Sequence, residues 1–250
     1  MAETDLHGKR AIVTGGASGI GLACVREFRR RGAHVIVADH HVYQTEAVAE
    51  ELGAEPWIVD LADTAALEDV RLDADILVNN VGMQRVNPIA EFSPEDFRHI
   101  QRLMVESPFL LIRATLPGMS RRGWGRIVNI SSVHGLRASA FKSAYVTAKH
   151  ALEGLSKVTA LEGARFGVTS NCVNPAYVRT PLVERQITDQ ARVHGIGEDE
   201  VVEKIMLTET AIKRLIEPEE VASLVGWLVG DAAGMVTGAS YTMDGGWTAR

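Results

Sequence analysis

A glycine-rich turn between two short apolar runs restricts the fold of this sequence more than any other feature. Residues 10–14 have the composition of a buried strand, and Gly-Gly-Ala-Ser-Gly-Ile-Gly follows at residues 15–21. An amphipathic segment then runs to Gly32, the expected C-cap of a helix. A second apolar run, residues 34–38, ends in Asp39. This order predicts a β-α-β unit of about 30 residues.

The glycines of this turn predict a dinucleotide-binding site. Gly15 allows the tight turn, Gly19 lets backbone N–H groups approach a pyrophosphate, and Gly21 lets the helix pack close to the strand. Asp39 can accept hydrogen bonds from both ribose hydroxyls of an adenosine and would repel a 2′-phosphate. No Arg or Lys lies in the turn or directly after Asp39, so the sequence favours NAD over NADP. A purely structural turn is the alternative.

Strand and helix patterns alternate along the whole chain, which is typical of an α/β fold. We expect residues 1–250 to form a single domain: a doubly wound parallel sheet of the Rossmann type, with a small helical lid at about residues 182–211. Ligands should bind at the carboxyl ends of the strands. The predicted strands cover residues 10–14, 34–38, 57–59, 76–78, 126–130, 168–173 and 238–243, and the predicted helices include residues 44–52, 62–70, 143–161 and 218–228.

Polar residues at other strand ends extend the predicted site. Asp60 could reach the adenine amino group or could N-cap the helix at residues 62–70. Asn80 and Gly82 would give polar groups and close backbone access beside the cofactor. The turn at residues 174–181 would lie over a nicotinamide.

Ser132, Tyr145 and Lys149 form the candidate catalytic set. Tyr145 and Lys149 are four residues apart in a predicted helix, so their side chains lie on one face. An ammonium beside a phenol favours the phenolate and lowers the pKa of the tyrosine from about 10 toward the range of a general acid or base. Ser132, at a strand end, can donate a hydrogen bond to the same substrate oxygen. Taken alone, Tyr-x-x-x-Lys also fits a solvated helix face.

Composition excludes several classes of function. The net charge of −6 and the absence of any Lys/Arg run beyond residues 29–31 argue against a nucleic-acid surface. No apolar stretch approaches the roughly 18 residues of a membrane span, and the polar first residues predict no signal peptide. Cys24 and Cys172 have no metal-binding or redox spacing, so we expect reduced core thiols, no metal site and a cytoplasmic protein.

Five motifs in order resemble the short-chain dehydrogenase/reductase family over essentially the whole chain. They are Thr14-Gly-x-x-x-Gly-Ile-Gly21, Asn79-Asn-x-Gly82, Ser132, Tyr145-x-x-x-Lys149 and Asn174-Pro175. Within this family, the sequence resembles bacterial members that act on D-3-hydroxybutyrate. The stretches that carry this resemblance are residues 82–84, 132–135, 141–145, 179–187, 189–191 and 244–249. The resemblance also implies a homotetramer built from the long helices and the last strand.

The resemblance assigns roles to these residues. Ser132 would polarise the substrate oxygen, Tyr145 would exchange its proton, and Lys149 would hold the nicotinamide ribose and depress the pKa of Tyr145. The implied cofactor-binding set is Gly15, Ser18, Gly19, Ile20, Gly21, Asp39, Asp60, Leu61, Asn80, Gly82, Tyr145, Lys149, Pro175, Val178 and Thr180.

The implied substrate pocket consists of Gln84, His134, Lys142, Gln186 and Trp247. Lys142 would supply a cation for a carboxylate, His134 and the two glutamines would add hydrogen bonds, and Trp247 would form an apolar wall near the methyl end. Singly, Lys142 also fits a surface lysine and His134 a capped loop histidine.

Three residues depart from the family pattern. Met104 occupies the position where the family usually has an asparagine that takes part in a proton relay. It lies in a predicted long helix, which Ser93 should N-cap and Pro108 should kink or divide. A thioether cannot donate a hydrogen bond and accepts one only weakly. Val81 replaces the usual alanine beside the cofactor, and Ala176 replaces the usual glycine after Pro175, where a positive φ could matter.

Together the motifs and the family resemblance they carry imply an NAD-dependent oxidoreductase that interconverts D-3-hydroxybutyrate and acetoacetate. Its partners would be a small 3-hydroxy or 3-keto acid and further copies of itself. The alternatives are a related alcohol or 3-oxoacyl reductase with a wider pocket, and a dinucleotide-binding sensor or scaffold with weakened chemistry.

Overall fold

One parallel sheet forms the centre of the molecule. The computed structural model describes residues 5–249 except 182, 185–186, 189–190 and 192–194. The seven strands lie in the order β3-β2-β1-β4-β5-β6-β7, all parallel. This confirms the predicted fold class, with strand ends that differ from prediction by at most two residues. The strands are β1 (Arg10–Thr14), β2 (His34–Asp39), β3 (Glu55–Ile58), β4 (Ile76–Asn79), β5 (Gly125–Ile130), β6 (Val168–Pro175) and β7 (Ser240–Met243).

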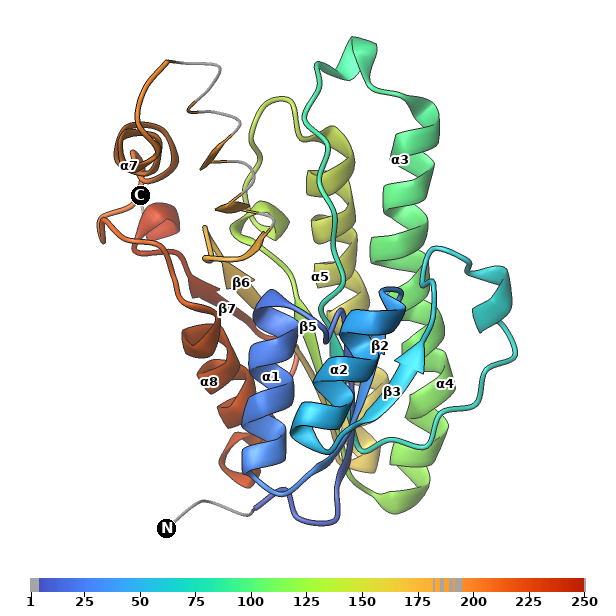
Figure 1. Cartoon of the computed structure of the whole chain (residues 1–250). Coiled ribbons are helices and arrows are strands. Elements are labelled where there is room, and N and C mark those ends of the chain that lie inside the picture. The colour runs from blue at the N-terminus through green and yellow to red at the C-terminus, as the bar shows by residue number, and fades with distance from the viewer. Residues whose placement is uncertain (1–4, 182, 185–186, 189–190, 192–194, 250) are drawn as a thin grey trace.

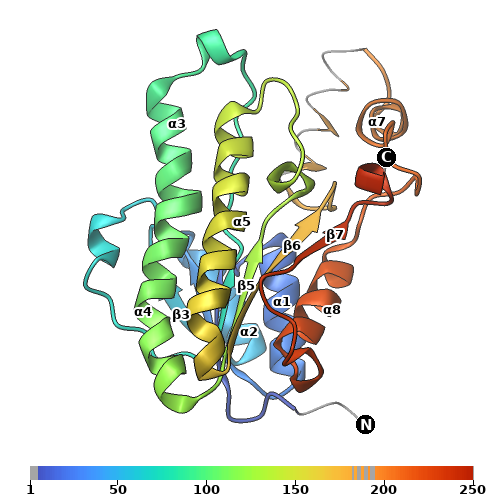
Figure 2. The same cartoon turned by 180° about the vertical axis from the view of Figure 1, so that it is seen from behind.

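Helices cover both faces of the sheet (Figures 1 and 2). On one face lie α1 (Gly19–Arg30), α2 (Val42–Leu52) and α8 (Pro218–Val229). On the other lie α3 (Pro94–Gln101), α4 (Ser107–Arg122) and α5 (Ser143–Gly163). Because both faces are covered, every residue of β5 and β6 is buried.

Alternate residues of each central strand enter two separate cores. Val13 and Val128 pack in the core under α1 and α8, which contains Phe28. Their neighbours Ile12 and Ile127 pack in the core under α4. The period of two places one side chain on each face and makes these strands apolar throughout.

The long helix after Ser93 is divided near Pro108, as predicted. Ser93 Oγ accepts a hydrogen bond from the Asp96 N–H at 3.3 Å and caps α3. A π-helical turn over Arg102–Glu106 separates α3 from α4. Proline has no N–H to donate to the carbonyl four residues earlier, that of Met104. The wider turn joins the two helices at this position.

The predicted helix at residues 62–70 is wrong. The structure has only a short 3₁₀ turn there, Ala65–Leu67. Asp60 Oδ1 accepts from the Ala62 N–H at 2.9 Å, and Asp63 Oδ1 accepts from the Ala66 N–H at 3.4 Å. These side chains offer the backbone local bonds that compete with a helix. Asp60 therefore closes a turn and caps no α-helix.

The segment after β6 has its own small apolar cluster. Val201, Met206, Leu207 and Leu215 are buried together near α7 (Glu198–Val201). In Figure 1 α7 lies beyond the carboxyl ends of the strands, where a lid is predicted. Within the described residues, no helix combines the length and apolar character that crossing a membrane requires.

Candidate active site

A cavity of about 500 Å³ lies at the carboxyl ends of the strands, where the order reverses between β1 and β4. This is the position where open α/β sheets bind ligands. Gly21 and Leu61 are buried outside the cavity lining, and the exposed Asp60 does not line it either. The predicted cofactor residues that do line it are Gly15, Ser18, Gly19, Ile20, Asp39, Asn80, Gly82, Tyr145, Lys149, Pro175, Val178 and Thr180.

The glycine positions of the turn leave no room for a side chain. Gly15 and Gly19 have φ of +62° and +52°. A Cβ on Gly21 would lie 2.1 Å from the carbonyl oxygen of Gly15. Asn80 Nδ2 donates to the carbonyls of Thr14 at 2.9 Å and Gly15 at 3.3 Å. The amide of Asn80 thus holds the turn against the end of β4 and is engaged by the protein itself.

Asp39 is fixed at the end of β2. Only 7% of it is exposed. Oδ2 accepts from the Ala17 N–H at 3.3 Å, and Oδ1 accepts from the His41 N–H at 3.2 Å. His40 and His41, which our sequence analysis missed, line the cavity beside it. The signal for them was their position directly after the acidic residue.

The structure brings Ser132, Tyr145 and Lys149 to the same cavity. Ser132 Oγ accepts from the His134 N–H at 3.2 Å and donates to the Pro175 carbonyl at 3.4 Å. Lys149 Nζ donates to the Ile130 carbonyl at 2.6 Å and lies 5.6 Å from the centre of the Tyr145 ring. One hydroxyl, one phenol and one ammonium therefore face a common space.

The expected lowering of the pKa of Tyr145 is not found. Burial raises the pKa of Tyr145 above its ordinary value, and a hydrogen bond with Ser132 only partly opposes this. Burial also lowers the pKa of Lys149 to about 8. Desolvation is the largest cause of both shifts, and a sequence does not show the degree of burial.

The three departures from the family pattern are accommodated sterically. Met104 is buried, and its Sδ accepts from the Met83 N–H at 3.5 Å. Val81 Cγ2 would lie 3.2 Å from a Cβ on Gly15, so the valine packs against the glycine turn. Among the described non-glycine residues, only Phe141 has a positive φ, so Ala176 is not strained.

Four of the predicted substrate residues lie close to the catalytic set. Gln84 lines the cavity. Lys142 Nζ lies 3.2 Å from His134 Nε2, and the His134 ring centre is 5.4 Å from that of Trp247 and 6.1 Å from that of Tyr145. The fifth, Gln186, lies outside the described residues.

Electrostatics make His134 a neutral partner of Lys142. Burial, followed by the nearby Lys142 cation, lowers the pKa of His134 to about 4. The imidazole is therefore uncharged at neutral pH, and its Nε2 can accept from the ammonium. Burial also lowers the pKa of Lys142.

Comparison with known proteins assigns the family. A family model described as short chain dehydrogenase matches residues 9–191. The chain belongs to the short-chain dehydrogenase/reductase family. D-beta-hydroxybutyrate dehydrogenase of Rhizobium meliloti is 44% identical, over 97% of this chain and 99% of that protein. The protein of the same name from Cupriavidus necator is 40% identical, over 98% of this chain and 100% of its own length.

Solved structures agree with this assignment. L-sorbose reductase from Gluconobacter frateurii, in complex with NADPH and L-sorbose, superimposes with a TM-score of 0.90 at 29% identity. The alignment covers 99% of each chain. As a member of this family, the protein is an oxidoreductase.

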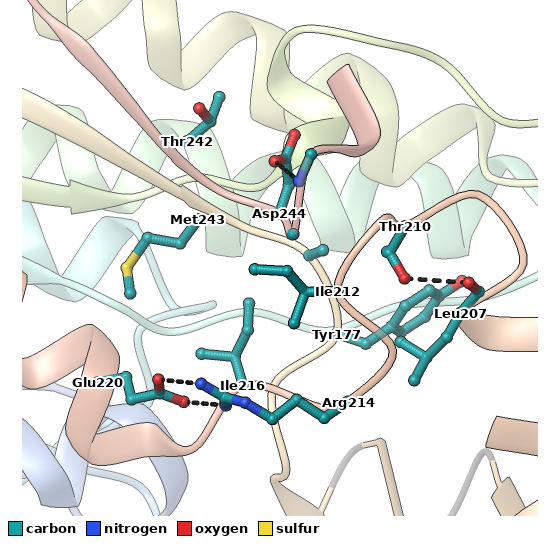
Figure 3. Close-up of a pocket in the computed structure, with 13 residues that line it drawn as sticks. Tyr177, Leu207, Thr210, Ile212, Arg214, Ile216, Glu220, Thr242, Met243 and Asp244 are labelled. Carbon is teal, nitrogen blue, oxygen red and sulfur yellow. Dashed lines mark hydrogen bonds and ion pairs between the residues drawn. The ribbon is translucent and has the colours of Figure 1, made fainter. Parts of the chain in front are cut away.

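A second cavity of about 310 Å³ lies beside the end of β7 (Figure 3). Tyr177, Leu207 and Ile216 give it apolar walls, and a two-bonded ion pair between Arg214 and Glu220 lies at its side. None of the predicted site residues within the described part of the chain lines this cavity. The candidate chemistry of this short-chain dehydrogenase therefore lies in the larger cavity.

Glu153 is a buried polar residue near the site to which the sequence analysis gave no role. It lies on α5 one helical turn after Lys149 and is 5% exposed. Its spacing of four residues from Lys149 was the available signal.

Proposed function

We propose that this short-chain dehydrogenase interconverts D-3-hydroxybutyrate and acetoacetate with NAD. The observation that carries the proposal is the pair formed by Lys142 and His134, 3.2 Å apart and next to Tyr145. A partly desolvated ammonium beside a neutral imidazole is a binding site for a small carboxylate. The names of the two hydroxybutyrate dehydrogenase relatives support the same substrate class.

The pocket suits a short substrate. A carboxylate held by Lys142 places the neighbouring carbons of a four-carbon acid near Tyr145. Gln84 can add a hydrogen bond, and Trp247, packed edge-to-face with His134, supplies an apolar wall. His134 accepts from the Lys142 ammonium and so holds it in place.

Proton transfer falls to Tyr145. Ser132 can donate a hydrogen bond to the reacting oxygen while Tyr145 exchanges a proton with it. Because burial raises the pKa of Tyr145, the phenol holds its proton at neutral pH. A protonated phenol is the acid needed to reduce a 3-keto acid.

The residues that would hold the cofactor fit a dinucleotide. The glycines of the turn let a ligand approach the backbone N–H groups, and a Cβ on Gly19 would meet Thr180 Cγ2 at 3.1 Å. Asp39 would accept from the adenosine ribose, and Lys149 from α5 would hold the nicotinamide ribose. The bound cofactor would accept a hydride as NAD when the 3-hydroxy acid is oxidised and donate one as NADH when the 3-keto acid is reduced. The carboxylate of Asp39 favours NAD over NADP.

Absorbance at 340 nm tests the proposal. We expect NADH to form from D-3-hydroxybutyrate with NAD, and much less from the L-enantiomer or with NADP. Lys142→Met should raise the KM for D-3-hydroxybutyrate about 10- to 100-fold, the effect of one charged hydrogen bond. Lys157→Met, an exposed lysine on α5, is the matched control.

Saturable NAD binding without NADH formation would contradict the proposed substrate. That result would favour another alcohol or 3-oxoacyl substrate. NAD binding without activity on any 3-hydroxy acid or alcohol would favour a sensor or scaffold.

A homotetramer is the proposed assembly. Phe109 on α4 and Val158 and Leu161 on α5 are exposed apolar side chains on the long helices. Light scattering after size-exclusion chromatography would test the assembly, and a mass near 27 kDa would contradict it.

A further inference from the structure

Glu153 joins four elements around the candidate active site. Its Oε1 accepts from Asn174 Nδ2 and its Oε2 accepts from Ser240 Oγ, both at 2.6 Å. Asn174 Nδ2 also donates to the backbone carbonyl of Ser132 at 2.9 Å. The carboxylate therefore links α5, the end of β6, β7 and the backbone of the candidate catalytic serine.

The surroundings are shaped to admit this carboxylate. A Cβ on Gly135 would lie 2.9 Å from Glu153 Oε1. Gly135 follows Ser132 in the 3₁₀ turn Val133–Gly135, so the turn can approach α5 only because this residue lacks a side chain. Ser132 and Glu153 are thus held at a fixed separation by packing as well as by hydrogen bonds.

A structural role alone does not explain a charged group here. The hydrogen-bond partners of Glu153 are neutral: the amide of Asn174, the hydroxyl of Ser240 and the thiol of Cys172. A glutamine could still accept from the Asn174 amide through its oxygen and donate to the Ser240 hydroxyl through its nitrogen. Burying a carboxylate has a large desolvation cost. The charge of Glu153 acts on Lys149, which lies one helical turn earlier. Burial lowers the pKa of Lys149, and the nearby Cys172 and Glu153 raise it in part. Tyr145 on α5 and Cys172 on β6 are the other titratable groups at Lys149.

We propose that Glu153 is a positioning residue of the active site: its carboxylate fixes Ser132 through Asn174 and keeps a negative charge one helical turn from Lys149. The inference rests on the proposed function for the identity of the reaction, and on hydrogen bonds and burial for the role of Glu153.

Glu153→Gln tests the charge while it keeps the shape and both neighbours Asn174 and Ser240 within hydrogen-bond reach, with the bond to the Ser240 hydroxyl reversed in direction. We expect the alkaline limb of the pH profile of kcat to move to lower pH by about 1 unit, because loss of a nearby negative charge lowers the pKa of Lys149. Glu162→Gln, an exposed glutamate on the same helix, should leave the profile unchanged. Coincident profiles for wild type and Glu153→Gln would overturn the electrostatic part.

Glu153→Ala tests the positioning. We expect kcat per dinucleotide-binding site to fall about 100-fold, with a KM close to that of the wild type, because displacement of a catalytic group by about 1 Å has an effect of this size. Ser240→Ala removes one of the two bonds and should give a smaller loss in a folded protein. Wild-type kcat in both variants would overturn the proposal.

A measurement without substrate separates this inference from the proposed function. The melting temperature of Glu153→Gln relative to wild type should rise between pH 6 and pH 9, because Lys149 loses its proton at lower pH in the folded variant. This result together with inactivity on D-3-hydroxybutyrate would refute the substrate alone. A pH-independent difference would refute the role of the Glu153 charge.

Discussion

The glycine-rich turn after β1 and the polar cluster after β5 occupy equivalent places at the edge of the sheet, yet they are built by opposite means. The turn is specified by missing side chains: Gly15 has a positive φ, and Gly21 lies against the Gly15 carbonyl. The cluster is specified by buried polar side chains, with Lys149 donating to Ile130 and His134 beside Lys142.

This difference determines which substitutions and which changes of pH should impair each region. The turn tolerates no added volume, but it contains no titratable group and should be insensitive to pH. The cluster depends on desolvated groups whose charge states follow burial, so it should respond to pH and to loss of a single polar atom. Four predictions test the contrast, from the largest effect to the smallest.

Removal of one oxygen atom from the cluster should abolish most of the activity. Tyr145→Phe should lower kcat about 10²- to 10⁴-fold, the usual contribution of a general acid or base, and leave dinucleotide binding intact. Steady-state rates with cofactor binding by fluorescence will measure this. Tyr43→Phe, a surface position, is the control. Comparable kcat in both variants would remove Tyr145 from the mechanism.

Added volume in the turn should be nearly as damaging. Gly21→Ala places a Cβ 2.1 Å from the Gly15 carbonyl oxygen and should lower the free energy of unfolding by about 3 kcal/mol, with loss of dinucleotide binding. Gly154→Ala on α5 has open space around its Cβ and should stabilise by about 0.5–1 kcal/mol. Denaturant unfolding of both variants measures the change in stability. A loss of stability in Gly21→Ala but not in Gly154→Ala would show that crowding at the turn is its cause.

Acid should destabilise the cluster through His134. Its pKa is lowered to about 4 in the folded state by burial and Lys142, so below about pH 6.5 the unfolded chain binds a proton that the folded chain does not. The resulting loss of stability grows as the pH falls from 6.5 to 4 and reaches about 3 kcal/mol. His134→Gln should flatten this part of the unfolding curve, whereas His150→Gln, at an exposed position, should not.

The smallest effect is expected at Ala176. Because Ala176 has no positive φ, Ala176→Gly should bring no relief of strain and should lower stability by about 0.5–1 kcal/mol through chain entropy. The affinity for NAD should stay within about twofold, a difference below 0.5 kcal/mol. A clear gain in affinity would show that the extra methyl group crowds the cofactor.

The strands of the sheet could be predicted from the sequence because each strand has its own local pattern of apolar residues. Residues 10–14 were assigned correctly as β1, since a strand buried on both faces is apolar throughout. The prediction of a helix at residues 62–70 was wrong, because Asp60 and Asp63 accept hydrogen bonds from nearby backbone N–H groups there and only Ala65–Leu67 forms a 3₁₀ turn.

For the candidate site, the motifs identified the side chains but not their burial or their hydrogen-bond partners. Lys149 and Tyr145 line one cavity, yet the direction of the Tyr145 pKa shift depends on burial, which arises from distant elements. Glu153 was missed because its partners Asn174 and Ser240 are far away in sequence. Met104 was expected to be a weak acceptor and is one, toward Met83.

The side-chain amide of Asn80, which spans from β4 to the turn after β1, has a consequence for synthesis of the chain. A nascent chain of 70 residues already contains the entire first β-α-β unit, but it lacks the strand that borders β1 on its other side. The carbonyls of Thr14 and Gly15 then have no amide to bind. Non-local pairing of this kind forms late, so we expect affinity for dinucleotide to appear only after β4 has left the ribosome and paired with β1.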